Sequence, residues 1–358
     1  NIEDIYPLSP MQEGLLFQKL YLPDSKAYFV QNLFVINQSL DKEVFKNTWE
    51  FVVGHYEILR TGFKWNDLDH ALQFVTKDIK LNWTEEDWKD LSPNQIQKKI
   101  DRLLQRDKET DFNYEKPPLM RFYLITVSES LCYFVWSFHH LLLDGWCSSI
   151  LMNALKIVYS GLRTRQIAKL KTHKPYRIFI EWLQSYNYEV SKEFFKENMQ
   201  EVSVTSLSKA LPDINIFDDN NEFGNKQFCL SEEDSKLLRD FAKAQKVTLN
   251  TLFQASWALL LRYYTQQHDV VFGVVFSGRS MPIDGIEDMV GLFINTLPLR
   301  INIHSQILTV KDLLEQVSIA SVQLQKYSHV PLFKILNWTE IKERIDLFDT
   351  VLIFENFQ

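Results

Sequence analysis

The sequence predicts a mixed α/β protein built from two lobes, and three observations support this prediction. Its 358 residues exceed the usual size of one compact domain. Hydrophobic residues make up 46% of the chain, which is enough for a substantial core and too many for intrinsic disorder. Helical and strand-like segments are mixed, with hairpins in place of strict strand–helix–strand alternation, which favours two open α/β layers side by side.

Apolar periodicity predicts the elements in order along the chain. The first helix follows a loop with two prolines and has Ser9 as its expected N-cap. Helices are expected at residues 11–17, 42–56, 95–104, 147–159, 176–198, 232–245, 250–264 and 310–327. Strands are expected at residues 29–36, 119–127, 131–138, 226–230, 269–276, 292–303 and 349–354, and the second and third of these form a hairpin.

The segment from Gly161 to Lys174 is basic and polar and is the expected connection between the lobes. We therefore expect an N-terminal lobe at residues 1–165 and a C-terminal lobe at residues 166–358. Residues 202–226 are rich in Ser, Asp, Asn, Pro and Gly, which indicates a long irregular segment.

Charge and composition exclude several function classes. The formal net charge is −7 and the pI is near 5.7, so the chain lacks the basic excess that binding to nucleic-acid phosphates needs. Only 10 glycines argue against Gly-rich phosphate-binding loops. The three cysteines, Cys132, Cys147 and Cys229, are too scattered for a disulfide framework or a structural zinc site. Cys132 and Cys147 lie in apolar surroundings and are expected to be buried small hydrophobes.

The sequence has no run of 18 apolar residues and no signal-peptide pattern, so we expect a soluble, cytoplasmic protein that does not bind membranes. Both ends look cut. The chain has no initiator Met, and residues 352–358 stop in or just after a strand-like apolar run, whereas native domain ends are usually polar. We therefore expect an excised piece of a longer polypeptide.

The segment FHHLLLDGW, residues 138–146, needs a chemical explanation because it lies where a buried strand gives way to a helix. Neighbouring side chains on a strand point to opposite faces, so His139 and His140 cannot both face the core. A neutral histidine can accept a proton or hold a nucleophile. Asp144 and Gly145 predict a tight turn. On residue types alone, a buried histidine pair beside an ordinary turn explains the segment as well as a catalytic site does. A metal site is less expected, because His140 and Asp144 have no third His, Asp or Glu nearby at ligand spacing.

The string HHLLLDG, residues 139–145, matches the HHxxxDG signature of nonribosomal peptide synthetase condensation domains, which are related to chloramphenicol acetyltransferase and to carnitine and BAHD acyltransferases. Six other segments resemble further motifs of that family, in the same order. They are YPLSPMQEG (6–14), HYEILRTGF (55–63), YRIFIEW (176–182), VGLFINTLPLR (290–300), SHVPL (328–332) and FDT (348–350). Ile178 in place of the usual Asp, and Cys147 where Ser is common, depart from the pattern.

The resemblance implies a fold and an activity. Each half would adopt a chloramphenicol-acetyltransferase-like fold, and the two lobes would form a V-shaped pseudodimer with an active-site tunnel between them. The C-terminal lobe is expected to lack its final segment. The implied enzyme is an acyltransferase of peptide-antibiotic assembly lines, which joins the amine of a carrier-bound aminoacyl acceptor to a carrier-bound acyl or peptidyl thioester donor.

The family's roles for the signature residues carry over to this chain by motif. His140 would be the catalytic or positioning residue in the tunnel, and His139 would pack and hold the turn. Asp144 would be structural and would form an ion pair with Arg60.

Three further residues are expected to line the tunnel. Gly145 would border the path of the pantetheine arm, beside Trp146. Asn295 would lie on the opposing lobe, where an Asx turn explains it equally well.

The resemblance also implies the partners. Upstream donor and downstream acceptor peptidyl carrier domains would deliver substrates on 4′-phosphopantetheine arms, and an adenylation domain would be a neighbour. The domain would need no cofactor or metal of its own. Two alternatives remain: an epimerisation domain of the same superfamily, for which no Glu-x-His-Gly-Arg-like motif is found, and a catalytically silent module that recruits partner enzymes. A heterocyclisation domain is excluded because it would carry an Asp-rich signature in place of HHxxxDG.

Overall fold

The computed structural model describes residues 1–22, 25–78, 80–166, 169–211, 224–304, 309–339 and 347–355. Contacts within the chain divide it into two compact units. Among the described residues, unit 1 comprises Asn1–Tyr186 and Pro282–Phe293, and unit 2 comprises Asn187–Met281 and the segment that begins at Ile294 and is described as far as Glu355. The division expected after residue 165 therefore differs from that of the structure, because the next 21 residues and the later segment Pro282–Phe293 both pack within unit 1.

Unit 1 is built around a four-stranded sheet and a three-stranded sheet. Its helices are α1 (Pro10–Tyr21), α2 (Lys42–His55), α3 (Pro93–Glu109), α4 (Gly145–Thr164) and α5 (Arg177–Ser185), with short 3-10 helices η1 (Glu57–Arg60) and η2 (Ile286–Asp288). Its strands are β1 (Ile2–Pro7), β2 (Phe29–Ile36), β3 (Thr61–Lys64), β4 (Leu72–Thr76), β5 (Trp83–Asp87), β6 (Met120–Ser128) and β7 (Leu131–His139). The strand orders are β2-β7-β6-β5 and β1-β4-β3.

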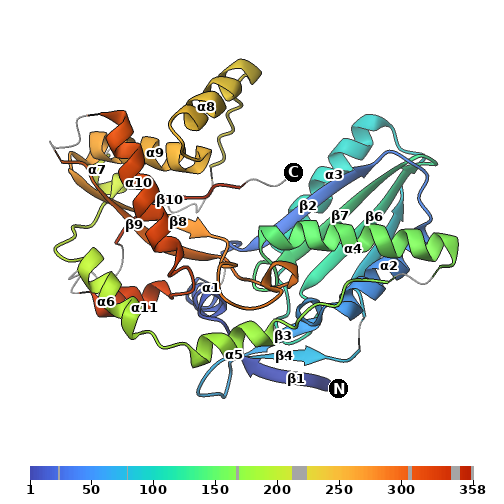
Figure 1. Cartoon of the computed structure of the whole chain (residues 1–358). Helices are drawn as coiled ribbons and strands as arrows, with labels where there is room; N and C mark the ends of the chain where they lie inside the picture. The colour runs from blue at the N-terminus through green and yellow to red at the C-terminus, as the bar shows by residue number, and fades with distance from the viewer. Residues whose placement is uncertain are drawn as a thin grey trace. The chain divides into compact units, whose positions relative to one another are not determined.

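The larger sheet places the histidine motif at the end of a central strand. β7 pairs antiparallel with β2 and with β6, so the expected hairpin of β6 and β7 is present, whereas β5 runs parallel to β6. Figure 1 shows α2 and α4 across one face of this sheet. On that face Trp49 of α2 packs against Phe122, Phe134 and Trp136, with ring centroids 4.9 to 5.7 Å away. A separate apolar cluster joins α3 to the sheet through Ile125 and Val135 and their neighbours.

A buried carboxylate fixes α3 to the sheet. Asp107, near the end of α3, is 1% exposed and accepts hydrogen bonds from four side chains. The donors are Arg121 Nε at 2.6 Å, Gln31 Nε2 at 2.7 Å, Ser137 Oγ at 2.5 Å and Tyr123 Oη at 3.0 Å. These donors come from β6, β2 and β7, so one carboxylate links the helix to three strands. Burial and Asp107 together raise the pKa of the Tyr123 phenol to about 12.

Unit 2 contains a three-stranded sheet covered by helices. Its elements are α6 (Glu189–Asn198), α7 (Leu207–Ala210), α8 (Glu232–Ala244), α9 (Leu249–Thr265), β8 (Asp269–Phe276), β9 (Asn295–Asn302), α10 (Val310–Gln325), α11 (Leu332–Trp338) and β10 (Val351–Leu352). The strand order is β10-β8-β9, with β10 parallel to β8 and β9 antiparallel to it. The core of this unit gathers buried side chains of the sheet, α9 and α10.

Several expected elements differ from the structure. The strand expected at residues 226–230 is wrong: the described chain there pairs with no other strand, and a strand needs a partner for its backbone groups. The helix expected at residues 176–198 is two helices, α5 and α6. The short strands β1, β3, β4 and β5 were not predicted. Residues 212–223 of the expected irregular segment lie outside the described residues.

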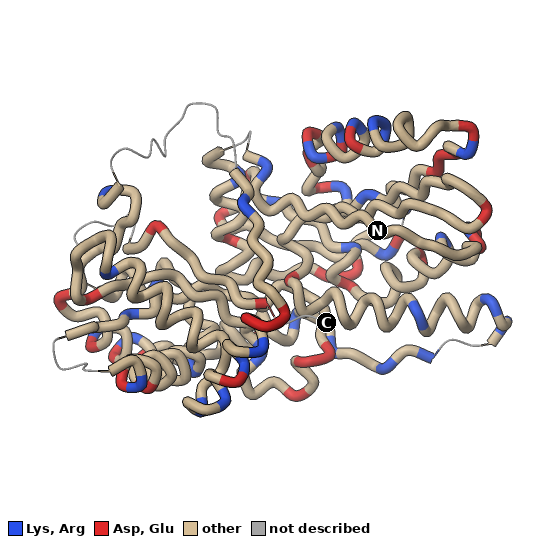
Figure 2. The backbone as a smooth tube through the Cα atoms, turned by 90° about the horizontal axis from the view of Figure 1, so that it is seen from above, with Lys and Arg blue, Asp and Glu red and all other residues tan. Residues whose placement is uncertain are grey.

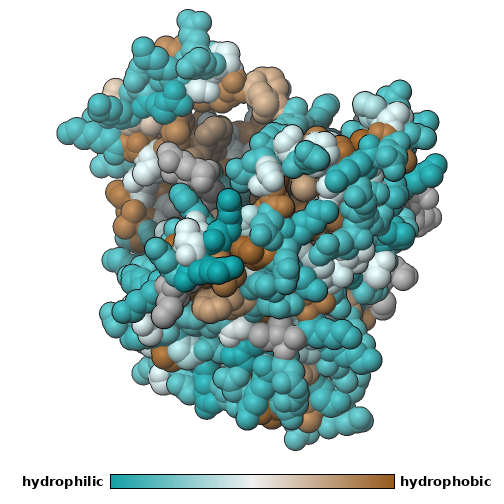
Figure 3. Space-filling view, turned by 90° about the vertical axis from the view of Figure 1, so that its right-hand side faces the viewer, coloured by the Kyte–Doolittle hydropathy of each residue, from teal (hydrophilic) through white to brown (hydrophobic). Residues whose placement is uncertain are grey.

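The surface carries charges of both signs. Lys and Arg are interspersed with Asp and Glu along both units (Figure 2), and the face in Figure 3 is largely hydrophilic. Among the described residues, no helix has the length and apolar character needed to cross a membrane. The cytoplasmic location stays a prediction.

We expect Asp107→Ala to destabilise unit 1. The substitution leaves the guanidinium of Arg121, whose side chain is 12% exposed, without its carboxylate, and breaking such a pair costs about 3 kcal/mol. Urea unfolding measures the loss. Asp101→Ala, on the exposed side of the same helix, is the control and is expected to change the free energy of unfolding by less than about 0.5 kcal/mol. Equal stabilities of the two variants would contradict the role of Asp107.

Candidate active site

The histidine motif begins where the β2–β7 ladder ends. Phe29 of β2 pairs with His139, the last residue of β7. One residue further along each strand, the backbone N–H of His140 donates to the carbonyl of Tyr28 at 2.8 Å. The chain then turns, because the N–H of Leu142 donates to the carbonyl of His139 at 3.1 Å. The two histidines thus lie at the boundary between a rigid sheet and a tight turn.

His139 is a packed, neutral side chain. It is 4% exposed, and its Nδ1 accepts a hydrogen bond from the N–H of Leu141 at 3.1 Å. The rings of Tyr114 and Phe112 lie edge-on to it, with centroids 5.1 and 6.3 Å away. Burial, together with the electrostatic effects of His140 and Lys19, lowers the pKa of His139 to about 3. This ring therefore stays unprotonated at neutral pH and holds the turn.

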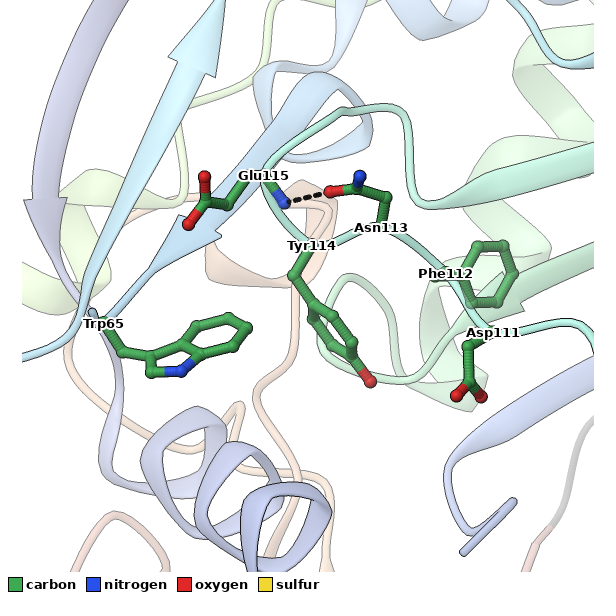
Figure 4. Close-up of a pocket in the computed structure, with 6 residues that line it drawn as sticks. All are labelled: Trp65, Asp111, Phe112, Asn113, Tyr114 and Glu115. Carbon is green, nitrogen blue, oxygen red and sulfur yellow. Dashed lines mark hydrogen bonds between the residues drawn. The ribbon is translucent and has the colours of Figure 1, made fainter. Parts of the chain in front are cut away.

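A pocket adjoins the aromatic side chains that pack on His139. Its volume is about 490 Å³, and its lining is Trp65 with the loop residues Asp111, Phe112, Asn113, Tyr114 and Glu115. Figure 4 shows the Tyr114 ring between Trp65 at one end and Asp111 at the other. The loop is held by a hydrogen bond from the N–H of Glu115 to Asn113 Oδ1 at 3.1 Å, and Tyr114 accepts one through its carbonyl from the N–H of Phe63 at 2.8 Å. The loop behind His139 therefore has a defined shape.

His140 differs from its neighbour. It is partly exposed, and its Nδ1 is buried without a hydrogen-bond partner among the described residues. No described protein group therefore fixes which ring nitrogen carries the proton. A neutral imidazole can donate a proton from one ring nitrogen and accept one at the other. No group of three or more His, Cys, Asp and Glu side chains suited to a metal ion occurs in the described ranges.

Asp144 joins the start of α4 to a distant segment of the same unit. It is 2% exposed and is the N-cap of α4, where Oδ1 accepts from the N–H of Cys147 at 3.2 Å. Its second oxygen, Oδ2, accepts from the N–H of Phe293 at 2.9 Å. The carboxylate therefore caps the helix, whose N-terminus favours negative charge, and also fixes the segment Pro282–Phe293 to unit 1.

Cys147 also bonds to the segment Pro282–Phe293, and the sequence did not predict this role. The thiol is buried, as expected, but its Sγ also lies 3.2 Å from Asp144 Oδ1 and 3.1 Å from the carbonyl oxygen of Gly291. The N–H of Gly291 donates back to Sγ at 3.3 Å. Tyr176 Oη donates to the carbonyl of Leu292 at 2.6 Å. A Cβ at Gly291 would lie 2.1 Å from the ring of Tyr176, which explains the glycine.

The ion pair expected between Arg60 and Asp144 is wrong. Arg60 is 7% exposed, and its Nη1 donates to the carboxylate of Glu3 and to the carbonyl of Thr76 at 2.7 Å. Arg60 ends η1 immediately before β3, so its side chain reaches β1 and β4 of the three-stranded sheet. Arg60 therefore stabilises the three-stranded sheet. Asp144 instead caps the start of α4.

Gln12 is a supporting residue that sequence reasoning missed. It is fully buried on α1, and its Nε2 donates to the carbonyl of Leu141 at 3.0 Å, inside the histidine motif. Its Oε1 accepts from the N–H of Ser9 at 2.9 Å and from Gln73 Nε2 at 2.9 Å. Ser9 is the N-cap of α1, as expected. The sequence offers no clear signal for this role, because Gln12 stands beside the charged Glu13 and only the structure shows that its amide is buried and bonded.

The remaining expected tunnel residues lie in different units. Gly145 begins α4, and Trp146 is 40% exposed, with its Nε1 donating to the carbonyl of Glu287 at 3.1 Å. Asn295, in unit 2, donates through Nδ2 to the carbonyls of Ser328 at 2.9 Å and Val330 at 2.7 Å. That amide links two of the recognised motifs. A tunnel-lining role for these residues stays a prediction.

We expect His139 to make stability depend on pH. Its pKa is about 3 in the folded chain and about 6.5 in the unfolded chain, so its contribution is complete above pH 6.5 and is lost as pH falls towards 3. Between pH 7 and pH 5 the free energy of unfolding of the native protein should therefore fall about 2 kcal/mol further than that of His139→Phe. Urea titrations at both pH values measure this difference. His70→Phe, at an exposed position, should behave like the native protein, and an equal fall in His139→Phe would contradict the prediction.

Comparison with known proteins identifies the family. A family model described as Condensation domain matches residues 2–358. Bacitracin synthase 3 of Bacillus licheniformis is 34% identical over 361 residues, which cover 100% of this chain and 6% of that protein. Gramicidin S synthase 2 of Brevibacillus brevis is 34% identical over 363 residues, covering 100% of this chain and 8% of that protein. The chain thus spans a small fraction of the length of these curated relatives.

Solved structures share the fold. The starter condensation domain of rhizomide synthetase superposes with a TM-score of 0.80 at 18% identity, covering 98% of this chain and 78% of that one. The first condensation domain of the calcium-dependent antibiotic synthetase has a TM-score of 0.76 at 17% identity, covering 99% and 82%. These matches confirm the expected mixed α/β, acetyltransferase-like fold class. The chain, with its HHxxxDG motif at the end of β7, belongs to the condensation-domain family of nonribosomal peptide synthetases.

Proposed function

We propose that this domain forms an amide bond between an acyl or peptidyl thioester donor and the amine of an aminoacyl acceptor, with His140 in contact with the reacting amine. The observation that carries the proposal is the contrast between the two histidines. His139 is buried and has a low pKa, whereas His140 is partly exposed and has a buried Nδ1 without a described partner. Of the two, His140 is therefore the one free to exchange a proton with substrate.

The reaction needs only the chemistry of an amine and a thioester. The amine nitrogen attacks the thioester carbonyl, the new C–N bond forms, and the C–S bond breaks as the thiol departs with a proton. His140 takes a proton from the amine nitrogen as the C–N bond forms, or orients the amine lone pair towards the carbonyl. Tethered substrates react at high effective concentration, so orientation accounts for much of the rate. The thioester is already activated, so the step itself consumes no nucleotide.

The proposal extends to the partners. Upstream donor and downstream acceptor peptidyl carrier domains present the two substrates on 4′-phosphopantetheine arms, and an adenylation domain loads the acceptor. The large size of the curated relatives compared with this chain supports a place within a longer synthetase. We propose that two acetyltransferase-like lobes form the expected V-shaped pseudodimer and enclose a tunnel to which Gly145, Trp146 and Asn295 contribute.

His140→Ala should lower the rate of dipeptide formation about 100-fold or more, which is the usual contribution of a proton-transferring side chain. The assay mixes the protein with one donor-loaded and one acceptor-loaded carrier and detects dipeptidyl product by mass spectrometry. His70→Ala, at an exposed histidine, is the control and should keep the native rate.

The same assay tests the alternatives. A native rate in His140→Ala would refute the role of His140. Exchange of the α-hydrogen without amide product would indicate an epimerisation domain. No reaction with any loaded carrier pair would favour a silent, partner-recruiting module.

A further inference from the structure

Another pocket of unit 1 lies away from the histidine motif. Its volume is about 310 Å³, and β2, β7, α2, α4 and the loop between β2 and α2 supply its lining. It lies on the sheet face that carries α2 and α4 (Figure 1), beside β2, which is an edge strand of the four-stranded sheet. Residues 138–146 do not line it. It is therefore a separate cavity from the candidate active site.

The lining changes from apolar to polar between the inside of the pocket and its mouth. Trp49, Phe134 and Leu155 are buried and form the inner end. Half-buried apolar and aromatic side chains form the walls: Phe34, Ile36, Leu40, Phe45, Met152 and Tyr159. Gln38, Lys156 and Ser160 are exposed, so they lie at the mouth. Small-molecule sites have this composition, with apolar surface that buries most of the ligand and a few polar groups that fix its orientation.

The mouth of this pocket carries positive charge. Lys156 is the only charged residue of the lining, and it forms no ion pair within the part of the chain that the structure describes. Lys156, Tyr159 and Arg163 are three and four residues apart, so they share one face of α4. The guanidinium of Arg163 lies 5.9 Å from the centroid of the Tyr159 ring. Two cations therefore lie on this side of α4.

One carboxylate lies near the same tyrosine and is already engaged. Asp41 is the N-cap of α2, and its Oδ1 accepts a hydrogen bond from the N–H of Val44 at 3.1 Å. The N–H of Asp41 donates to Tyr159 Oη at 3.2 Å. With two cations beside one carboxylate, the mouth attracts an anionic group.

We propose that this pocket binds a free fatty acid as its carboxylate, with the hydrocarbon chain against the apolar lining and the carboxylate at Lys156. A ligand with a single polar end matches a lining whose charged, amide and serine side chains all lie at the mouth. A volume of about 310 Å³ corresponds to roughly ten groups of the size of water, about 30 Å³ each, and a methylene group is of similar size. Decanoate is therefore the expected fit. This site is independent of the proposed amide-forming reaction.

Calorimetric titration of the protein measures the affinity for decanoate below the concentration at which it forms micelles. We expect the dissociation constant to rise about fourfold for each methylene group removed, from decanoate to octanoate to hexanoate. Decanol and decyltrimethylammonium keep the chain but replace the anion by a neutral group and by a cation. Decanoate should bind at least about threefold more tightly than decanol, and decyltrimethylammonium most weakly of the three. Equal affinities for the three head groups would overturn the proposal.

Two pairs of variants test the two ends of the ligand. Lys156→Glu should weaken decanoate about fivefold and leave decanol unchanged. Lys98→Glu is its control, because Lys98 is exposed on α3, which packs on the opposite face of the sheet. Met152→Trp should fill the pocket and weaken both ligands about tenfold or more, whereas Met152→Leu keeps the volume and should keep both affinities. Urea unfolding checks that the four variants fold. Native affinity for decanoate in a folded Met152→Trp would contradict the proposal.

A spectroscopic measurement locates the ligand. In protein labelled with ¹³C at the methionine methyl groups, six in all, the signal of Met152 is the one missing in Met152→Leu. Saturating decanoate should shift this signal, and Lys156→Glu should raise the concentration of decanoate that the shift requires. Saturable binding that leaves the Met152 signal in place would put the ligand elsewhere and overturn the proposal. An absence of saturable binding would overturn it as well.

Discussion

The carboxylate of Asp144 is the contact on which the other parts of the site depend. One oxygen caps α4 and so fixes where the turn after β7 ends, and the other holds the N–H of Phe293. Because the residue is 2% exposed, water cannot replace either partner at low cost. This buried carboxylate therefore joins the start of α4 to the segment Pro282–Phe293. Cys147 and Tyr176 add hydrogen bonds to Gly291 and Leu292 of the same segment.

Between the end of β7 and the cap at Asp144, the histidine motif is held through its backbone. The N–H of His140 donates to Tyr28, and the carbonyl of Leu141 accepts from Gln12. In addition, Nδ1 of His139 accepts a hydrogen bond from the N–H of Leu141 in the turn that follows. These bonds hold the main chain of the motif, while Nδ1 of His140 is buried without a hydrogen-bond partner among the described residues. A rigid loop with one uncommitted side chain is the arrangement that orientation-based catalysis requires.

The sequence predicted the parts of this arrangement that depend on local pattern. Strands β2 and β8 were expected at their observed bounds, and Ser9 was expected as a cap, because period and capping chemistry are local. The partner of Arg60 was not predictable in this way. A guanidinium can pair with any carboxylate within reach, and the pairing with Glu3 depends on how β1 adds to a three-stranded sheet whose strands were not predicted. The role of Gln12 is likewise set by a long-range contact, with the carbonyl of Leu141.

Cys147 shows how a departure from a family motif can keep its physical role. Sequence reasoning treated it as a small hydrophobe, and its burial agrees with that. A thiol is also a weak hydrogen-bond donor and acceptor, with longer contacts than a hydroxyl. Its sulfur lies 3.1 to 3.3 Å from three polar atoms of Asp144 and Gly291. The position therefore needs a small group that can both donate and accept within a buried helix start, and serine and cysteine both meet this need. Alanine would pack there but would leave the amide and carbonyl of Gly291 without this partner.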